Sequence, residues 1–260
     1  MPFEVVQVPV WTDNYAYLLI AQDGSSGLVD SPEAGPILEI LDQRSLRLTH
    51  IFNTHHHPDH IGANSELARR FPGLEIWGGL YDSEHGRIPG QTRALLHDET
   101  FHWGGSRCRV LEVPGHTLGH IAYAWDHGAV FVGDTLFVGG CGRLFEGTPE
   151  MMERTLYGIL GELPDDSLLY CGHEYTEANL RFARSVDGDN PELLEFSLEV
   201  ERAREEGHPT VPSRLHTEWA VNPFMRCDSE AIRRATGSSS EVPRHEVFGI
   251  LRAMKDRFRG

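Results

Sequence analysis

Apolar and polar positions change their spacing repeatedly along the first 173 residues. Apolar residues alternate with polar ones, or fill short runs, in segments that we predict as strands: 3–10, 15–21, 27–30, 48–53, 75–77, 107–113, 121–125, 129–132 and 167–170. Apolar residues recur at helical spacing in three segments between them, which we predict as helices: 36–46, 62–71 and 149–160. This alternation of strands and helices predicts an α/β fold.

The pattern changes near residue 174. Beyond it, apolar positions repeat only at helical spacing, so we predict helices and no further strand. The expected helices cover residues 175–186, the segment that Pro191 opens, and a last segment around Leu251. Residues 210–226 and 237–243 lack such a repeat and are expected to be loops. We therefore predict two domains, residues 1–173 and a helical domain of residues 174–260.

One predicted strand runs directly into a histidine-rich segment, Thr-His-His-His-Pro-Asp-His at residues 54–60. His55 and His57 are two positions apart, so in extended backbone their side chains point the same way and can share one metal ion. Asp59 and His60 follow a proline that turns the chain, and they can face a second ion. Imidazole nitrogen and carboxylate oxygen are the ligands of zinc and iron. The segment therefore predicts a metal site on a loop at the end of a strand.

Three more candidate ligands follow predicted strands in the same way: His116, Asp134 and His173. Seven ligands suit two metal ions. If Asp134 bridges them, one ion is left with His55, His57 and His116 and the other with Asp59, His60 and His173. The predicted cofactors are two divalent metal ions, zinc first, with iron or manganese as alternatives. Because zinc lowers the pKa of bound water to ~7, the site predicts hydrolysis by a hydroxide.

Charge and apolar content limit the partners and the location. The 260 residues include 23 basic and 39 acidic ones, and the net charge of −16 argues against nucleic acid or an anionic membrane as a partner. No apolar run approaches the ~20 residues of a membrane span. The N-terminus has no signal-peptide pattern. We expect a cytoplasmic protein that is a monomer.

The cysteines and the lysine usage add two details. The four cysteines form no Cys-x-x-Cys pair, so we predict free buried thiols. Cys141 lies among glycines, which leaves a reactive thiol as the alternative at that position. Lys255 is the one lysine in the chain, and the other 22 of the 23 basic residues are arginine.

Four of these motifs resemble the metallo-β-lactamase superfamily: the histidine-rich segment at 54–60, Pro-Gly-His-Thr-Leu-Gly-His at 114–120, Gly-Asp-Thr at 133–135 and Gly-His-Glu at 172–174. That resemblance implies an αββα sandwich with a binuclear metal site between two β-sheets. Four others narrow it to glyoxalase II, hydroxyacylglutathione hydrolase: Thr-Asp-Asn-Tyr at 12–15, Gly-Gly-Cys-Gly-Arg at 139–143, Cys-Gly-His-Glu-Tyr at 171–175 and Asn-Pro-Phe-Met-Arg at 222–226. This second resemblance covers nearly the whole chain, including the C-terminal helical domain.

The resemblance implies hydrolysis of S-D-lactoylglutathione and related 2-hydroxyacylglutathiones to D-lactate and glutathione by a metal-bridged hydroxide. Asp59 and Asp134 are then the catalytic carboxylates. The glutathione thioester is the implied partner, bound by residues that occupy the family's basic and tyrosine positions: Arg143, Tyr175, Arg252 and Lys255. The chain departs from the family's pattern at Arg143, where lysine is frequent, and at Phe145, where a tyrosine often supplies a hydroxyl.

Four other functions agree less well with the sequence. Iron-dependent glutathione persulfide dioxygenases resemble it, but the helical domain with Asn-Pro-Phe-Met-Arg at 222–226 favours the hydrolase. A metal-stabilised binding protein without turnover is disfavoured because all seven ligands are present. The absence of a basic surface and the glutathione-type helical domain disfavour a nuclease or a β-lactamase.

Overall fold

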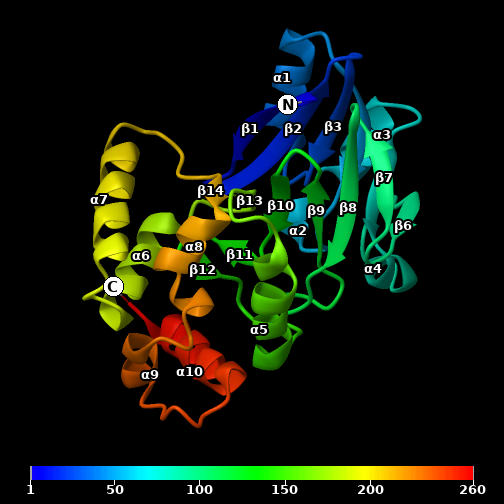
Figure 1. Cartoon of the computed structure of the whole chain (residues 1–260). Helices are drawn as coiled ribbons and strands as arrows, with labels where there is room; N and C mark the ends of the chain where they lie inside the picture. The colour runs from blue at the N-terminus through cyan, green and yellow to red at the C-terminus, as the bar shows by residue number, and fades with distance from the viewer. Residues whose placement is uncertain (1, 260) are drawn as a thin grey trace. The chain divides into compact units, whose positions relative to one another are not determined.

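The chain folds into two compact units. The computed structural model describes residues 2–259, and Figure 1 shows their helices and strands coloured along the chain. Of these residues, 2–112 and 119–133 belong to unit 1, and 113–118 and 134–259 belong to unit 2. Unit 2 thus includes residues on both sides of position 174, and the division predicted there stays a prediction.

The first sheet of unit 1 has six strands in the order β1-β2-β3-β4-β5-β6. Neighbouring strands are antiparallel from β1 to β3 and parallel from β3 to β6. The predicted strands that correspond to β1–β5 are confirmed, whereas the three-residue β6 is too short to show an alternation. The elements are β1 (Phe3–Val10), β2 (Asn14–Ala21), β3 (Ser25–Val29), α1 (Ala34–Gln43), β4 (Arg47–Phe52), α2 (Pro58–Ile61), α3 (Asn64–Arg70), β5 (Glu75–Gly79), α4 (Leu80–Glu84) and β6 (Arg93–Leu95).

Four antiparallel strands of unit 1 follow one another as an up-and-down meander. They are β7 (Thr100–Trp103), β8 (Ser106–Glu112), β9 (Ile121–Trp125) and β10 (Ala129–Gly133). The hairpin predicted for β9 and β10 is confirmed by the pairing of Val130 with Ala124 and of Phe131 with Tyr123. β7 was not predicted, because its four residues follow a long polar stretch without a clear pattern.

Aromatic side chains from both sets of strands fill the interior of unit 1. The ring of Phe52 on β4 lies 5.5 Å from Trp77, 5.8 Å from Phe101 and 5.6 Å from Tyr123, measured between centroids. Aromatic pairs at such distances contribute ~0.5–1.5 kcal/mol each beyond the area they bury. The Tyr123 hydroxyl donates to the Asn53 carbonyl at 2.9 Å. This bond anchors the chain where β4 ends and the histidine-rich segment begins.

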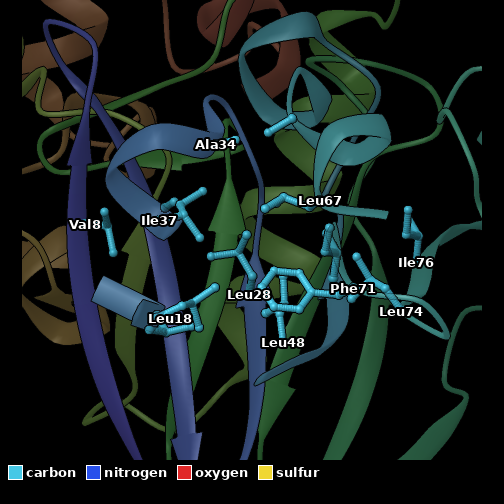
Figure 2. Packing of buried hydrophobic residues seen from close by; sticks show 14 of the residues in the cluster. Val8, Leu18, Leu28, Ala34, Ile37, Leu48, Leu67, Phe71, Leu74 and Ile76 are labelled. Atoms are coloured by element: carbon cyan, nitrogen blue, oxygen red, sulfur yellow. The ribbon is translucent and has the colours of Figure 1, made fainter. Parts of the chain in front are cut away.

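Helices α1 and α3 cover the other face of the six-stranded sheet. Figure 2 shows Ile37 of α1 and Leu67 of α3 beside Leu18, Leu28 and Leu48 of the strands. All five side chains are fully buried, and each buried side chain of this size contributes ~1.5–3 kcal/mol by leaving water. Unit 1 is therefore layered, with helices on one face of the first sheet and an aromatic core on the other.

Unit 2 is mainly helical and has two short strand pairs. β11 pairs with β12 and β13 pairs with β14, both antiparallel. α6 and α7 pack through a cluster that includes Leu180, Ala183, Leu193 and Val200. The elements are β11 (Leu136–Phe137), β12 (Gly140–Cys141), α5 (Pro149–Gly158), η1 (Leu160–Glu162), β13 (Leu168–Cys171), α6 (Thr176–Val186), α7 (Pro191–Glu205), β14 (Ser213–Arg214), α8 (Leu215–Val221), η2 (Pro223–Met225), α9 (Glu230–Thr236) and α10 (Arg244–Arg257).

Two predictions for the C-terminal part were wrong. Residues 210–226 do not form a loop, because β14, α8 and η2 lie within them, and β14 is a strand beyond residue 174. The buried face of α8 is Leu215, Glu218 and Val221, so a carboxylate interrupts the apolar repeat that would have indicated a helix. Among residues 2–259, no helix combines the length and the apolar composition that a membrane span requires.

Candidate metal centre

Unit 1 contributes four of the predicted ligands, from the loop and the short helix that follow β4. The His55 Nε2 atom lies 3.0 Å from His57 Nδ1, and His60 Nε2 lies 3.8 Å from Asp59 Oδ2. One ligand atom of His55 also lies within 4.8 Å of one of His60. Two ligands of a single tetrahedral zinc ion are about 3.3 Å apart when each bond is about 2.0–2.1 Å. The spacing of these side chains therefore suits metal binding.

Pro58 begins the short helix α2 and so places Asp59 and His60 in a helical turn rather than before one. The helix predicted at residues 62–71 is confirmed as α3, which begins at Asn64, and the separate helix α2 ends before it at Ile61. Asn14 contacts Asp59 through its side-chain nitrogen, which lies 3.3 Å from the backbone oxygen and 3.4 Å from Oδ2. The turn and this contact together orient the Asp59 carboxylate.

Asp30 contacts two residues of the histidine-rich segment and was not among the residues predicted for the site. Its Oδ1 accepts from the Thr54 backbone N–H at 2.8 Å, and its Oδ2 lies 2.8 Å from Thr54 Oγ1 and 2.7 Å from His60 Nδ1. A carboxylate that accepts from Nδ1 holds the imidazole so that Nε2 is the metal-binding atom. Asp30 is an acidic residue at the end of an apolar strand, as Asp134 is. The criterion that indicated Asp134 as a candidate therefore also applies to Asp30.

In unit 2, two of the predicted ligands, His116 and His173, lie close to one oxygen of the third, Asp134. Asp134 Oδ2 lies 3.5 Å from His116 Nε2 and 3.3 Å from His173 Nε2. All three side chains are buried. A carboxylate oxygen this close to two imidazole nitrogens can share a metal ion with them, and the bridging role of Asp134 stays a prediction. The donor set of unit 2 is thus two imidazoles and one carboxylate, which suits zinc, iron or manganese.

The loop after β12 orients the His116 ring. His116 Nδ1 lies 2.8 Å from the Arg143 carbonyl oxygen, which leaves Nε2 to face Asp134. A Cβ atom at Gly142 would lie 2.0 Å from the Asp134 carbonyl oxygen and 3.0 Å from His116 Nδ1. Only glycine allows the loop to approach the two ligands this closely.

Unit 2 also contains the four residues predicted to bind substrate. Tyr175 stacks on the ring of His173, with 4.6 Å between centroids and an interplanar angle of 6°. Arg143 is exposed and its Nε lies 3.7 Å from Asp256 Oδ1. Phe145 is 63% exposed and its ring edge lies against His116, with 5.3 Å between centroids. These side chains present aromatic and cationic surface beside the ligands of unit 2.

Lys255 lies in a cluster of positive charge. Its Nζ donates to the Ala178 carbonyl at 2.8 Å and lies 5.4 Å from the centre of the Phe182 ring. Burial, followed by the charges of Arg252 and Arg181, lowers the pKa of Lys255 to about 8. Positive side chains crowded together in an acidic chain are the arrangement expected for an anionic ligand.

Arg252 is buried, although it is one of the residues predicted to bind substrate. It is only 5% exposed, its Nη1 donates to the Cys141 carbonyl at 2.8 Å, and its Nη2 lies 3.0 Å from Asp256 Oδ1. Arg252 and Lys255 share a helix as predicted, but Arg252 reaches the β11–β12 hairpin while Lys255 reaches α6. The two side chains therefore have different local partners.

The cysteine prediction is confirmed, since all four thiols are free and buried. The alternative of a reactive Cys141 is not supported, because burial raises the pKa of its thiol to about 11 and the nucleophilic thiolate is suppressed. Cys141 belongs to β12, and its buried thiol takes no part in the proposed chemistry.

Two family models cover nearly the whole chain. Residues 11–173 match the metallo-beta-lactamase superfamily and residues 174–258 match the hydroxyacylglutathione hydrolase C-terminus. The hydroxyacylglutathione hydrolase of Synechococcus sp. (strain JA-2-3B'a(2-13)) is 49% identical over 98% of this chain and 99% of its own length. That of Methylococcus capsulatus (strain ATCC 33009 / NCIMB 11132 / Bath) is 48% identical over 99% of both.

Solved structures show the same fold at lower identity. ETHE1 from Myxococcus xanthus aligns over 98% of both chains with a TM-score of 0.66 and 24% identity. The BLEG-1 B3 metallo-beta-lactamase aligns over 86% of this chain and 100% of its own, with a TM-score of 0.64 and 20% identity. The chain therefore belongs to the hydroxyacylglutathione hydrolase (glyoxalase II) family of the metallo-β-lactamase superfamily and has its α/β fold, an αββα sandwich with a C-terminal helical region.

Proposed function

We propose that this chain hydrolyses S-D-lactoylglutathione, and related 2-hydroxyacylglutathiones, to D-lactate and glutathione. The observation that carries the proposal is the 44–49% identity to relatives named hydroxyacylglutathione hydrolase, over 95–99% of the chain. The match of residues 174–258 to the C-terminal model of that enzyme supports the same reading over the persulfide dioxygenase. We further propose residues 1–173 as the metal-binding domain and residues 174–260 as the substrate-binding domain.

We propose that the ligand sets of the two units together hold two divalent metal ions, zinc first, with iron or manganese as alternatives. One family model spans all seven residues, which supports a single centre: His55, His57, Asp59, His60, His116, Asp134 and His173. When bound, such ions supply a hydroxide nucleophile at neutral pH and stabilise negative charge on the substrate carbonyl oxygen. Asp134 is the shared ligand in this arrangement.

The protein's own groups then have defined tasks. Asp30 and the Arg143 carbonyl fix the orientation of two imidazoles, and Asn14 orients Asp59. No dedicated general acid is required, because the leaving thiol has a pKa near ~8.5 and departs readily as thiolate. Asp59 and Asp134, the two predicted catalytic carboxylates, contribute to catalysis as metal ligands.

We propose that the positive cluster in unit 2 binds the carboxylates of the glutathione moiety. Arg143 and Lys255 supply side-chain charge, Tyr175 supplies a half-exposed ring and hydroxyl, and Arg252 supplies buried charge. An acidic chain with a net charge of −16 needs such a local cluster to attract an anion. The cytoplasmic location and the monomeric state stay predictions.

Lys255→Ala is expected to raise KM for S-D-lactoylglutathione about tenfold with little change in kcat, because the lost contact is remote from the reacting carbonyl. In the unaltered enzyme, kcat/KM is expected to fall as pH rises through about 8, since Lys255 loses its charge there. Lys255→Arg, which stays charged, should lack that step. Steady-state kinetics between pH 6.5 and 9.5 measure both effects.

Arg257→Ala is the matched control for the Lys255 variants, because Arg257 is an exposed cation in the last turn of the same helix. It should leave KM unchanged. An unaltered KM in Lys255→Ala would assign Lys255 to the packing of α10 on α6 and exclude it from the substrate site.

The proposed activity is tested by steady-state hydrolysis of S-D-lactoylglutathione with protein whose metal content is counted in the same preparation. Turnover with about two metal ions per chain would support the hydrolase and the binuclear centre together. A filled binuclear centre without turnover would contradict the thioester assignment. A single iron with oxygen consumption on glutathione persulfide would replace the hydrolase by the dioxygenase.

A further inference from the structure

The β11–β12 hairpin is held by buried side chains rather than by its own short ladder. It follows directly on Asp134, and it turns at Gly139, whose φ of +67° favours glycine. Its consecutive backbone groups bind side chains from the helical part of unit 2: Phe137 O and Gly140 O accept from Asn222 Nδ2 at 3.3 and 2.9 Å, Val138 O accepts from Asn179 Nδ2 at 3.1 Å, Gly139 N donates to Glu218 Oε2 at 2.9 Å and Cys141 O accepts from Arg252 Nη1 at 2.8 Å.

Glu218 and Asn222 lie at the centre of the hydrogen bonds that hold the hairpin. Both are fully buried, and Asn222 Nδ2 donates to Glu218 Oε2 at 2.8 Å. The Asn222 Oδ1 atom accepts from the Phe224 backbone N–H at 3.0 Å, which fixes the amide so that its nitrogen faces the hairpin. Glu218 Oε2 thus accepts two hydrogen bonds, one from the Gly139 N–H of the hairpin and one from the Asn222 side-chain amide. The same amide also donates to two carbonyls of the hairpin.

A buried carboxylate at this position is energetically unfavourable by itself. Burial raises the pKa of Glu218 to about 7. An apolar residue of similar size would fill the space on α8 without that penalty, but it would leave the Gly139 N–H without an acceptor. Glu218 therefore stabilises the hairpin by accepting the hydrogen bond of the Gly139 N–H.

The hairpin in turn leads into the loop that orients a metal ligand. Gly142 N donates to the Thr135 carbonyl at 3.2 Å, which closes the loop beside Asp134. The next residue, Arg143, supplies the carbonyl that accepts from His116 Nδ1 at 2.8 Å. A shift of the hairpin would move that carbonyl and release the His116 ring.

We propose that Glu218 and Asn222 are positioning residues of the hydrolytic site, because they fix the hairpin whose Arg143 carbonyl keeps His116 Nε2 directed at Asp134. Both residues bind the backbone of the hairpin and each other. They act through the hairpin, and they give the helical part of unit 2 a role in the geometry of the ligands as well as in substrate binding. The inference rests on the proposed function for its kinetics but not for its metal affinity.

The test compares Glu218→Ala with Glu218→Gln by titrating zinc against a chromophoric chelator and by measuring kcat/KM. Glu218→Ala is expected to bind one of its two zinc ions about tenfold more weakly and to lose about 30-fold in kcat/KM. Glu218→Gln keeps an oxygen acceptor for Gly139 N and should stay within about twofold of the unaltered protein on both measures. This rescue by the amide distinguishes an acceptor from a charge.

Two further variants separate positioning from folding. Val221→Ala creates a small cavity in the apolar cluster of α6 and α7 and removes no hydrogen bond to the hairpin, so it should lower stability and leave zinc affinity unchanged. Asn179→Ala removes the donor to Val138 O from another helix and should weaken zinc binding about threefold, even if Glu218→Ala does not fold.

Unchanged zinc affinity in Glu218→Ala would overturn the proposal, and where that variant does not fold, unchanged zinc affinity in Asn179→Ala would do so. Losses of zinc affinity and kcat/KM in Glu218→Gln as large as those in Glu218→Ala would also overturn it. So would a loss of zinc affinity in Val221→Ala as large as that in Glu218→Ala. The zinc titration needs no substrate. It therefore decides the proposal separately, should the unaltered protein fail to hydrolyse S-D-lactoylglutathione.

Discussion

Asp134→Asn is expected to lose one of two bound metal ions and to lower kcat about 10³-fold. Asp134 Oδ2 lies 3.5 and 3.3 Å from the Nε2 atoms of His116 and His173, so this carboxylate is the common neighbour of both imidazoles in unit 2. An amide offers one neutral oxygen and a donor nitrogen that cannot bind a cation, so it cannot serve as a shared ligand. Metal analysis and steady-state hydrolysis on one preparation measure both losses.

Asp126→Asn is the matched control for Asp134→Asn. Asp126 lies in the β9–β10 turn of unit 1 and contacts Ser106 rather than any predicted ligand. It should keep both metal ions and full turnover. Retention of two metal ions with unchanged kcat in Asp134→Asn would remove Asp134 from the shared position and require another bridging group.

Predicted ligands could be found from the sequence because each follows a strand whose pattern is clear. β4 has the buried run Ile51 and Phe52 directly before the histidine-rich segment, and β10 is buried along all five residues before Asp134. The ends of long or fully apolar strands can be located from the sequence, and polar residues directly after them stand out as candidates. The side chains that orient these ligands left weaker signals, since an acid such as Asp30 acts on a residue 30 positions away.

The substrate site shows where spacing alone is insufficient. Arg252 and Lys255 are three positions apart, which predicts neighbouring side chains on one helix face. In the structure Arg252 turns inward to Cys141 O, because the hairpin carbonyl needs a donor, while Lys255 reaches Ala178 O. The sequence predicted the charges correctly but not the backbone groups that compete for them. Glu218 was missed for the same reason, since its acceptor role depends on a hairpin 79 residues earlier.

Asp30→Asn is the second change with a large expected effect, on metal binding and on stability together. The Asp30 carboxylate accepts from three donors, the Thr54 N–H, the Thr54 hydroxyl and His60 Nδ1. An amide can present oxygen to one side only, so its NH₂ group faces a donor on the other. We expect metal affinity to fall about 10–100-fold and the free energy of unfolding to fall by ~2–4 kcal/mol.

Zinc titration and urea unfolding measure the two effects of Asp30→Asn, with Asp23→Asn as the control. Asp23 accepts from Ser25 in an exposed turn, so the same chemical change there should alter neither quantity by much. Wild-type zinc affinity in Asp30→Asn would show that His60 keeps its orientation without the carboxylate.

Thr54→Val separates the two ways in which Asp30 can act. The substitution removes the hydroxyl that donates to Asp30 Oδ2 and that also lies 3.1 Å from His55 Nδ1, but it leaves the contact between Asp30 and His60 Nδ1. If Asp30 acts by bracing the loop after β4, Thr54→Val should reproduce much of the metal loss. If Asp30 acts by orienting His60, Thr54→Val should lower stability by ~1 kcal/mol and should weaken zinc binding only through the lost His55 contact, by much less than Asp30→Asn does. We expect the second result, because the 2.7 Å contact to a ligand imidazole is the shortest of the three.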